Sequence, residues 1–162
     1  MEWVGHSAAM RARLKMPSNA KPWSSNPAVA LPGIHTDRVV DLLDIAWFAE
    51  TTAKGLRTPD ELAAVRRHLV CDVSQSVERS PWTKGTTLHT FTTTGEMYSF
   101  ALDRKITQSE KFKALGFPPV DHGSLDDSAL RDLVGEAMAL PSVGAVVYAL
   151  VLGLDFLGLW GC

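Results

Sequence analysis

The spacing of apolar and polar residues in the first half of the chain predicts two helices in succession. Apolar residues recur at helical intervals over 37–53 with aspartates between them, which is typical of an amphipathic helix with one buried face. Gly55 is expected to close this helix. Thr58 is a plausible N-cap for the next helix and Pro59 suits its first position, so that helix should run to about Arg67.

Extended structure is predicted to follow these helices. Residues 68–73 are apolar and few enough for a buried strand. Residues 86–94 alternate hydroxyl-bearing and larger side chains, and 97–100 resume the extended character after a Gly-Glu pair, so a β-hairpin is expected. The threonines of 86–94 fit β propensity alone, and they also fit a row of hydroxyls that faces a phosphate backbone.

A short helix with strong signals at both ends comes next. Thr107 followed three residues later by Glu110 is the pattern of a capping box, which predicts that the helix begins at Gln108. Gly116 is expected to supply the left-handed residue that stops the helix, and Pro118 prevents its continuation. The sequence therefore predicts one helix of about two turns.

A further short helix is predicted after a loop over 119–126. Asp126 or Asp127 should cap it, and it should continue through about Val134. Gly135 is expected to end it.

The chain then enters a segment, 137–154, that carries no charge. Its length reaches the lower limit of a membrane span of about 17–25 residues. Pro141, Gly144 and Gly153 within the segment, with Asp155 just beyond it, favour a helix buried in the protein core. Membrane attachment is therefore not expected.

The first 33 residues differ in composition from the rest. Pro17, Pro22, Pro27 and Pro32 recur among serine, asparagine and alanine. A segment of this kind has few residues to bury, so 1–33 is expected to be a mostly unfolded leader. No apolar run follows its basic residues, so no secretory signal is predicted.

Composition bounds the class of protein. A chain of 162 residues, 46% hydrophobic and 21% charged, is long enough to bury a core. Cys71 and Cys162 give neither a disulfide framework nor zinc spacing, which indicates a reducing, intracellular setting, either nuclear or cytoplasmic. A net charge of -2 argues against binding of nucleic acid by bulk electrostatics.

The residues alone identify no catalytic or metal-binding set. The glycine-rich phosphate loop, the zinc-protease pattern and the serine-hydrolase elbow are not found in the sequence. His68 and Cys71 lie close in sequence, but two ligands do not make a metal site. The residues alone therefore predict a mixed α and β fold and identify no function.

Three segments together resemble a known enzyme family. Residues 104–118 read Arg-Lys-Ile-Thr-x-x-Glu and end in Leu-Gly-Phe-Pro, and they resemble the ninth conserved motif of DNA (cytosine-5) methyltransferases. Residues 135–141, Gly-Glu-Ala-Met-Ala-Leu-Pro, look like the family's tenth motif. Residues 88–93 are similar to the strand that closes its target-recognition region. The order of the segments matches the family, and the resemblance covers about 69–154.

The resemblance implies a fold and a set of roles. The fold would be helices with a small hairpin or sheet, like the C-terminal part of a Rossmann-like methyltransferase. Contacts with the DNA backbone would come from Thr90, Thr92 and Arg104, and Arg104 would also help to hold the recognition region in place. The wall of an S-adenosylmethionine pocket would be formed by Gly135, Glu136, Ala137 and Met138. Structural roles would fall to Thr107, Glu110, Gly116 and Pro118.

The chain also departs from the family pattern. Glu136 replaces an asparagine and would repel the cofactor carboxylate, and His89 stands where proline is usual. The Pro-Cys nucleophile and the Glu-Asn-Val acid are not found. The sequence therefore predicts a methyltransferase-like C-terminal fragment that contributes DNA and cofactor contacts without catalysing the reaction alone. The alternative is a non-enzymatic interaction module that keeps only the fold.

The expected partners and domain limits follow from this interpretation. Duplex DNA and a missing catalytic half, or another partner protein, are the candidate partners. The expected organisation is the leader 1–33, a helical segment 34–68 of no recognised family, a methyltransferase-like region 69–156 and a tail 157–162.

Overall fold

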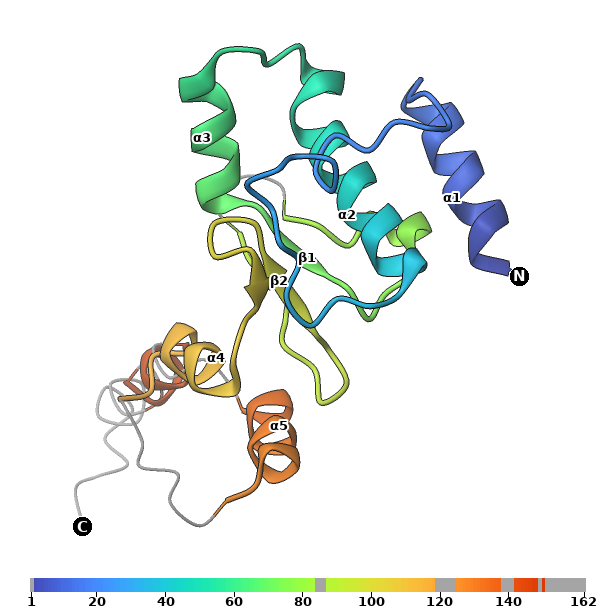
Figure 1. The fold of residues 1–162 in the computed structure, drawn as a ribbon. Helices are drawn as coiled ribbons and strands as arrows, with labels where there is room; N and C mark the ends of the chain where they lie inside the picture. Colours follow the sequence, from blue (N-terminus) through green and yellow to red (C-terminus); the bar gives the residue numbers. More distant parts are fainter. Residues whose placement is uncertain (1, 84–86, 119–124, 138–141, 149, 151–162) are drawn as a thin grey trace, which may run out of the picture. The chain divides into compact units, whose positions relative to one another are not determined.

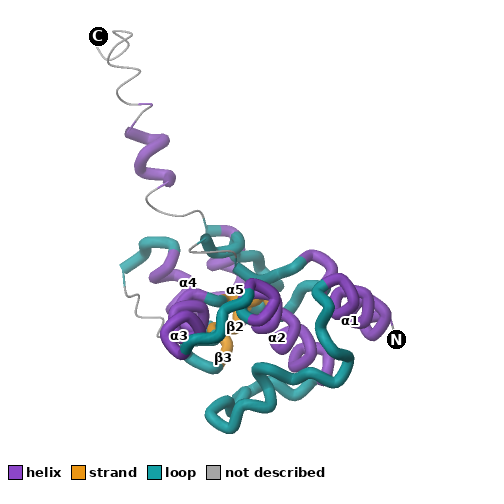
Figure 2. Tube along the Cα trace, turned by 90° about the horizontal axis from the view of Figure 1, so that it is seen from above, coloured by secondary structure: helices purple, strands orange, loops and turns teal. Residues whose placement is uncertain are grey.

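The computed structural model describes residues 2–83, 87–118, 125–137, 142–148 and 150. It shows a mixed α and β chain in which the strands are a small part of the trace (Figures 1 and 2). The mixed class predicted from the sequence is confirmed.

The chain divides into two compact units. The first unit contains residues 1–90 and 94–106, and the second contains 91–93 and 107–162. Residues 91–93 thus belong to the second unit although the residues on both sides of them belong to the first, and from Thr107 onward the chain belongs to the second unit. The expected boundary at residue 69 does not coincide with this division, because β1 and the helices before it belong to the same unit.

The described residues of the first unit form three α-helices: α1 (Glu2–Arg13), α2 (Asp37–Glu50) and α3 (Pro59–His68). A 3-10 turn, η1 (Thr52–Lys54), follows α2, and Gly55 ends it in the left-handed conformation with φ 76°. Thr58 caps α3 in a full capping box with Glu61. The two helices predicted over 37–67 are therefore confirmed.

Among the residues that the structure describes, the sheet of the first unit has three short antiparallel strands in the order β1-β2-β3. They are β1 (Val70–Asp72), β2 (Met97–Ser99) and β3 (Arg104–Lys105). Cys71 pairs with Tyr98, which pairs on its other side with Lys105. The buried strand predicted within 68–73 is confirmed.

The β-hairpin expected from 86–94 to 97–100 is wrong. The described residues 87–94 form no strand, and β2 pairs instead with β1 and with β3. Residues 87–90 are exposed, so their alternation has no buried face against which a strand could pack.

The prediction that 1–33 is unfolded is also wrong. Residues 2–13 form α1, which packs against α2 and the 3-10 turn η2 (Val77–Arg79). Further along, Trp23 is 1% exposed, with ring centroids 4.8 Å from Trp47 and 4.7 Å from Phe100. The prolines here separate short hydrogen-bonded turns, and Trp23, with Met16 and Ile34, buries apolar surface that helps to order them.

The second unit contains α4 (Gln108–Ala114) and α5 (Asp127–Glu136), which pack together. Both predicted ends of α4 are confirmed, since Thr107 and Glu110 form the capping box and Gly116 has φ 88°. Phe112 and Phe117 meet edge to face across that turn, with ring centroids 5.7 Å apart.

The helix α5 is capped as predicted but ends later than predicted. The Asp126 side chain accepts a hydrogen bond from the Ala129 N–H at 2.7 Å. The helix continues through Glu136, so Gly135 lies within it instead of ending it. The glycine is needed there for a close backbone approach, which is described below.

Residues 142–148 are helical, which agrees with the type of element predicted for the charge-free segment. Its predicted burial is wrong for the residues described, because Val146, Val147 and Tyr148 are 60%, 52% and 67% exposed. The rest of 137–154 lies partly outside the described residues. Within the part of the chain that the structure describes, no helix combines the length and the apolarity needed to cross a membrane.

Candidate functional site

The residues predicted to form a cofactor wall lie at the C-terminal end of α5. Gly135 is half-buried, Glu136 is exposed and Ala137 is half-buried. Met138 lies outside the described residues. An exposed carboxylate at this point gives the wall a negative charge, in contrast to the neutral asparagine of the family pattern.

Gly135 is in very close contact with the segment 91–93. A Cβ atom placed on Gly135 would lie 2.2 Å from the backbone nitrogen of Thr93 and 2.5 Å from its Cα. No side chain fits at that distance, so the position requires glycine. The structure therefore brings the predicted cofactor wall into direct contact with the threonine segment predicted to bind DNA.

Within that segment the side chains differ in exposure. Phe91 is 8% exposed and anchors the segment, whereas Thr92 is exposed. Thr92 thus has the accessibility that a phosphate contact requires.

The other two predicted DNA contacts, Thr90 and Arg104, belong to the first unit. Thr90 is exposed. Arg104 is half-buried in β3, and its Nη1 donates a hydrogen bond to the Lys105 carbonyl at 2.9 Å. Its guanidinium is therefore partly engaged with the protein backbone.

The residues predicted to be structural have well-defined local roles. The Thr107 N–H donates to Glu110 Oε2 at 2.9 Å, and the Glu110 N–H donates to Thr107 Oγ1 at 3.3 Å. These bonds satisfy donors that the first turn of α4 would leave open. Gly116 reverses the chain after α4, and the exposed Pro118 follows it.

Cys71 does not serve as a nucleophile in this fold. It is fully buried in β1, and desolvation raises the pKa of its thiol far above the ordinary range, with a further contribution from the charge of Asp72. The reactive thiolate form is therefore suppressed. Across the residues described, no group of three or more metal-ligating side chains could hold an ion.

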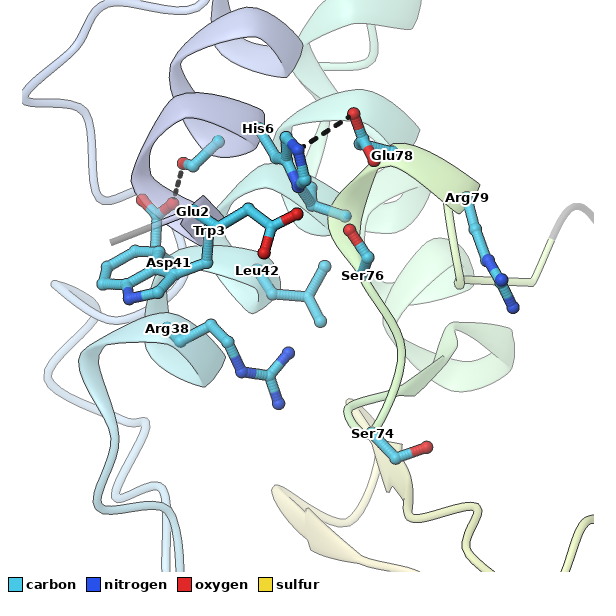
Figure 3. Close-up of a pocket in the computed structure, with 12 residues that line it drawn as sticks. Glu2, Trp3, His6, Arg38, Asp41, Leu42, Ser74, Ser76, Glu78 and Arg79 are labelled. Atoms are coloured by element: carbon cyan, nitrogen blue, oxygen red, sulfur yellow. Dashed lines mark hydrogen bonds and ion pairs between the residues drawn. The ribbon is translucent and has the colours of Figure 1, made fainter.

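A cavity that the sequence did not predict lies within the first unit (Figure 3). It has a volume of about 430 Å³, is open to solvent on one side, and is lined by the start of α1, by α2 and by the segment 74–79. Because residues 1–33 were expected to be unfolded, nothing in the sequence indicated that α1 would form one of its walls.

Charged groups of both signs line this cavity. Arg38 Nη1 donates to the Gln75 carbonyl at 3.0 Å and Nη2 donates to the Val73 carbonyl at 2.7 Å. His6 Nε2 lies 3.4 Å from Glu78 Oε1. The cavity is therefore polar, and cationic and anionic side chains lie close together along it: Arg38 with Asp41 on α2, and Arg79 with Glu78 on η2.

Comparison of the chain with protein families, with curated proteins and with solved structures found no match.

Proposed function

We propose that this chain is the C-terminal part of a DNA (cytosine-5) methyltransferase-like protein, which contributes DNA-backbone and S-adenosylmethionine contacts and does not catalyse methyl transfer alone. The observation that supports this most is the contact between Gly135 and Thr93, at which a Cβ atom would lie 2.2 Å from the Thr93 nitrogen. Two segments that the family resemblance assigns to cofactor and to DNA are thereby in contact within one unit. They lie more than forty positions apart in the sequence.

The proposed role has a physical reason. A methyltransferase must rotate its target base out of the duplex, and it can do so only if the neighbouring phosphates are held firmly. Thr92 is exposed and is followed by a backbone position fixed against α5, so its hydroxyl suits such a contact. The nucleophile and the acid would come from a catalytic half that this chain lacks. A Rossmann-like cofactor fold would be completed by that half.

Binding measurements on the purified chain test this proposal. Calorimetry with S-adenosylmethionine and fluorescence anisotropy with a labelled duplex would be run on the wild type, Glu136→Asn and Thr92→Val. Removing the charge of Glu136 should tighten cofactor binding by about fivefold, because one exposed like-charge contact costs on the order of 1 kcal/mol. Thr92→Val should weaken duplex binding and leave cofactor binding unchanged.

A matched control is available two residues along the chain. Thr94 is also exposed, but it lies outside the segment that contacts Gly135. Thr94→Val should therefore leave duplex binding unchanged. If neither the wild type nor Glu136→Asn binds either ligand, the retained-function proposal fails.

A second candidate function is a non-enzymatic interaction module. Two observations favour it: the exposed carboxylate of Glu136 at the proposed cofactor wall, and the exposed apolar side chains of Val146, Val147 and Tyr148. Exposed apolar surface of this kind commonly marks a protein contact. This candidate predicts that neither ligand binds and that Val147→Ser with Tyr148→Ser reduces self-association or partner binding, measured by sedimentation velocity.

A further inference from the structure

We propose that the cavity lined by α1, α2 and residues 74–79 binds a small zwitterion of the α-amino-acid class (Figure 3). Its volume of about 430 Å³ falls in the range of about 300–1,000 Å³ that small-molecule sites occupy. The cavity lies wholly within the first unit, and none of the residues assigned to DNA or cofactor lines it.

The carboxylate end of the ligand is assigned to Arg38. Two backbone carbonyls, those of Val73 and Gln75, hold its guanidinium in place at 2.7 Å and 3.0 Å. A guanidinium has more N–H donors than these two bonds use, and its charge remains to be balanced. Among the residues that the structure describes, no carboxylate forms an ion pair with Arg38.

Arg11, in the same unit, differs from Arg38 in having a carboxylate partner. Its guanidinium donates to the Asp41 carboxylate and to the carbonyls of Pro17 and Ala20, so both its charge and its donors are satisfied within the protein. Arg38 is fixed just as firmly but lacks the carboxylate. A fixed, half-buried and uncompensated guanidinium at a cavity wall is suited to receive a ligand carboxylate in bidentate geometry.

The ammonium end of the ligand is assigned to the opposite side of the cavity. Figure 3 shows His6 and Glu78 at the side away from Arg38, with the Glu2 carboxylate between them and Arg38. Two more charged residues line the cavity: Asp41, which is already paired with Arg11, and Arg79, which donates to Gln75 Oε1 at 3.1 Å. The carboxylates of Glu2 and Glu78 would attract an ammonium group and repel a ligand that carries only negative charge. Glu78 keeps an exposed position beside His6, where a hydrogen-bond donor can reach it.

Apolar side chains also line the cavity. Trp3, Leu42 and Val77 contribute to the lining. They would contact an aliphatic or aromatic side chain of the ligand, since apolar surfaces associate in water. The combination of a cation, an apolar wall and acids favours a zwitterion with an apolar side chain over a simple anion.

Calorimetric titration with matched ligands tests the assignment. L-leucine is the main probe; 4-methylpentanoate lacks its ammonium group and isoamylamine lacks its carboxylate, while the carbon skeleton is kept. L-methionine and L-phenylalanine extend the range of side chains. We expect at least one of the three amino acids to bind, and we expect both truncated analogues of L-leucine to bind at least about tenfold more weakly than L-leucine, because each loses a charge-assisted contact. If no amino acid binds, or if L-leucine and its analogues bind equally, the proposal is overturned.

Two variants test separately the contact with the ammonium group and the contact with the carboxylate of the ligand. Glu2→Gln changes an exposed residue in the first turn of α1, so the protein should remain folded. This variant should lose most of the preference for the amino acid over 4-methylpentanoate. Arg38→Lys keeps the positive charge but not the bidentate geometry, and it should weaken amino-acid binding about tenfold.

An exposed arginine outside the cavity provides the matched control. Arg67 lies in α3 and does not line the cavity, so Arg67→Lys should leave binding unchanged. Thermal unfolding of each variant identifies any loss of folded protein. If folded Glu2→Gln and folded Arg38→Lys both bind the amino acid as the wild type does, the cavity is not its site and the proposal is overturned.

Discussion

The helix α4 and the segment 16–34, named here the strap, are stabilised in different ways: α4 by residues near it in sequence, and the strap by residues far from it. The ends of α4 are fixed by residues within and beside it, namely Thr107, Glu110 and Gly116. The strap has no regular element, yet its Trp23 is among the most buried side chains of the chain. Order in α4 is therefore a local property, whereas order in the strap depends on partners far away in the sequence.

Those distant partners are specific. Trp23 Nε1 donates to the Tyr98 hydroxyl at 3.1 Å, across 75 positions of sequence. The Arg66 guanidinium lies 5.4 Å from the centroid of the Trp23 ring, within the range of a cation–π contact. The Ala30 N–H donates to Asp103 Oδ2 at 2.7 Å, where Asp103 occupies the left-handed turn between β2 and β3. The strap thus joins α3 and the sheet.

The largest expected effect comes from Trp23→Ala. Removing a fully buried tryptophan costs about 3–5 kcal/mol through lost burial and the cavity left behind. Since a whole domain is stable by only about 5–15 kcal/mol, this change should remove a large part of the first unit's free energy of unfolding. Urea denaturation followed by circular dichroism measures the loss.

Trp3→Ala is the control for this change, because Trp3 is only half-buried. It should cost clearly less than Trp23→Ala. Equal costs for the two variants would mean that the strap does not contribute to the core.

Asp44→Ala is expected to have the next largest effect. This carboxylate is 1% exposed and accepts hydrogen bonds from the backbone N–H groups of Trp23 and Ser24, both at 2.8 Å, and from the Ser24 hydroxyl at 2.6 Å. Its removal leaves buried donors unpaired, which costs about 1–3 kcal/mol. Asp37→Ala on the exposed start of the same helix should cost only a few tenths of a kcal/mol in a urea titration.

The contrast between the strap and α4 also explains what the sequence could predict. Helix N-caps are local sequence signals: Thr58 with Glu61, Thr107 with Glu110, and Asp126. The helices that begin at these caps start within a few residues of the positions predicted from the sequence. The strap contains the same prolines and serines as an unfolded tail, and its contacts with distant residues, above all the packing of Trp23, distinguish it from one. The β propensity of the threonine segment 87–94 predicted a strand that the structure does not contain. A strand forms only where it can pair with another strand and bury one face.

The candidate sites follow the same rule. Sequence motifs selected Gly135 and the threonine segment, and the structure brings Gly135 into contact with Thr93. The cavity at Arg38 could not be predicted, because its walls come from three segments that are far apart in sequence. No short sequence motif predicts that two backbone carbonyls hold the Arg38 guanidinium in place.

Tyr98→Phe should produce a smaller loss that depends on pH. The Tyr98 hydroxyl accepts from Trp23 and donates to Asp103, and its removal should cost about 1–2 kcal/mol. Desolvation raises the pKa of Tyr98 well above the ordinary tyrosine range, and the hydrogen bond to Asp103 adds to the rise. A raised native pKa means that the stabilisation is complete below the unfolded pKa of about 10 and is lost as pH rises above it. Alkaline unfolding should therefore depend less on pH in Tyr98→Phe than in the wild type; an identical dependence would contradict the assignment.

The smallest expected losses of stability come from removing a helix N-cap, and the same substitution can be compared in the two units. Thr58→Ala and Thr107→Ala each remove an N-cap and should cost about 1 kcal/mol, measured by amide exchange in α3 and α4. Thr36→Ala is the control, because Thr36 precedes α2 without a side-chain capping bond and should cost less.

Acid should weaken the α3 cap in a predictable direction. Hydrogen bonds from the Thr58 and Arg57 backbone lower the pKa of Glu61 below its ordinary value of about 4.3. A lowered native pKa means that the stabilisation is present above the unfolded pKa and is lost as pH falls through the native one. Exchange of the first α3 amides should therefore show an extra, acid-induced acceleration that Glu61→Gln abolishes. If Glu61→Gln kept this acceleration, the capping box would not be its source, and the ends of α3 would depend on tertiary packing as the strap does.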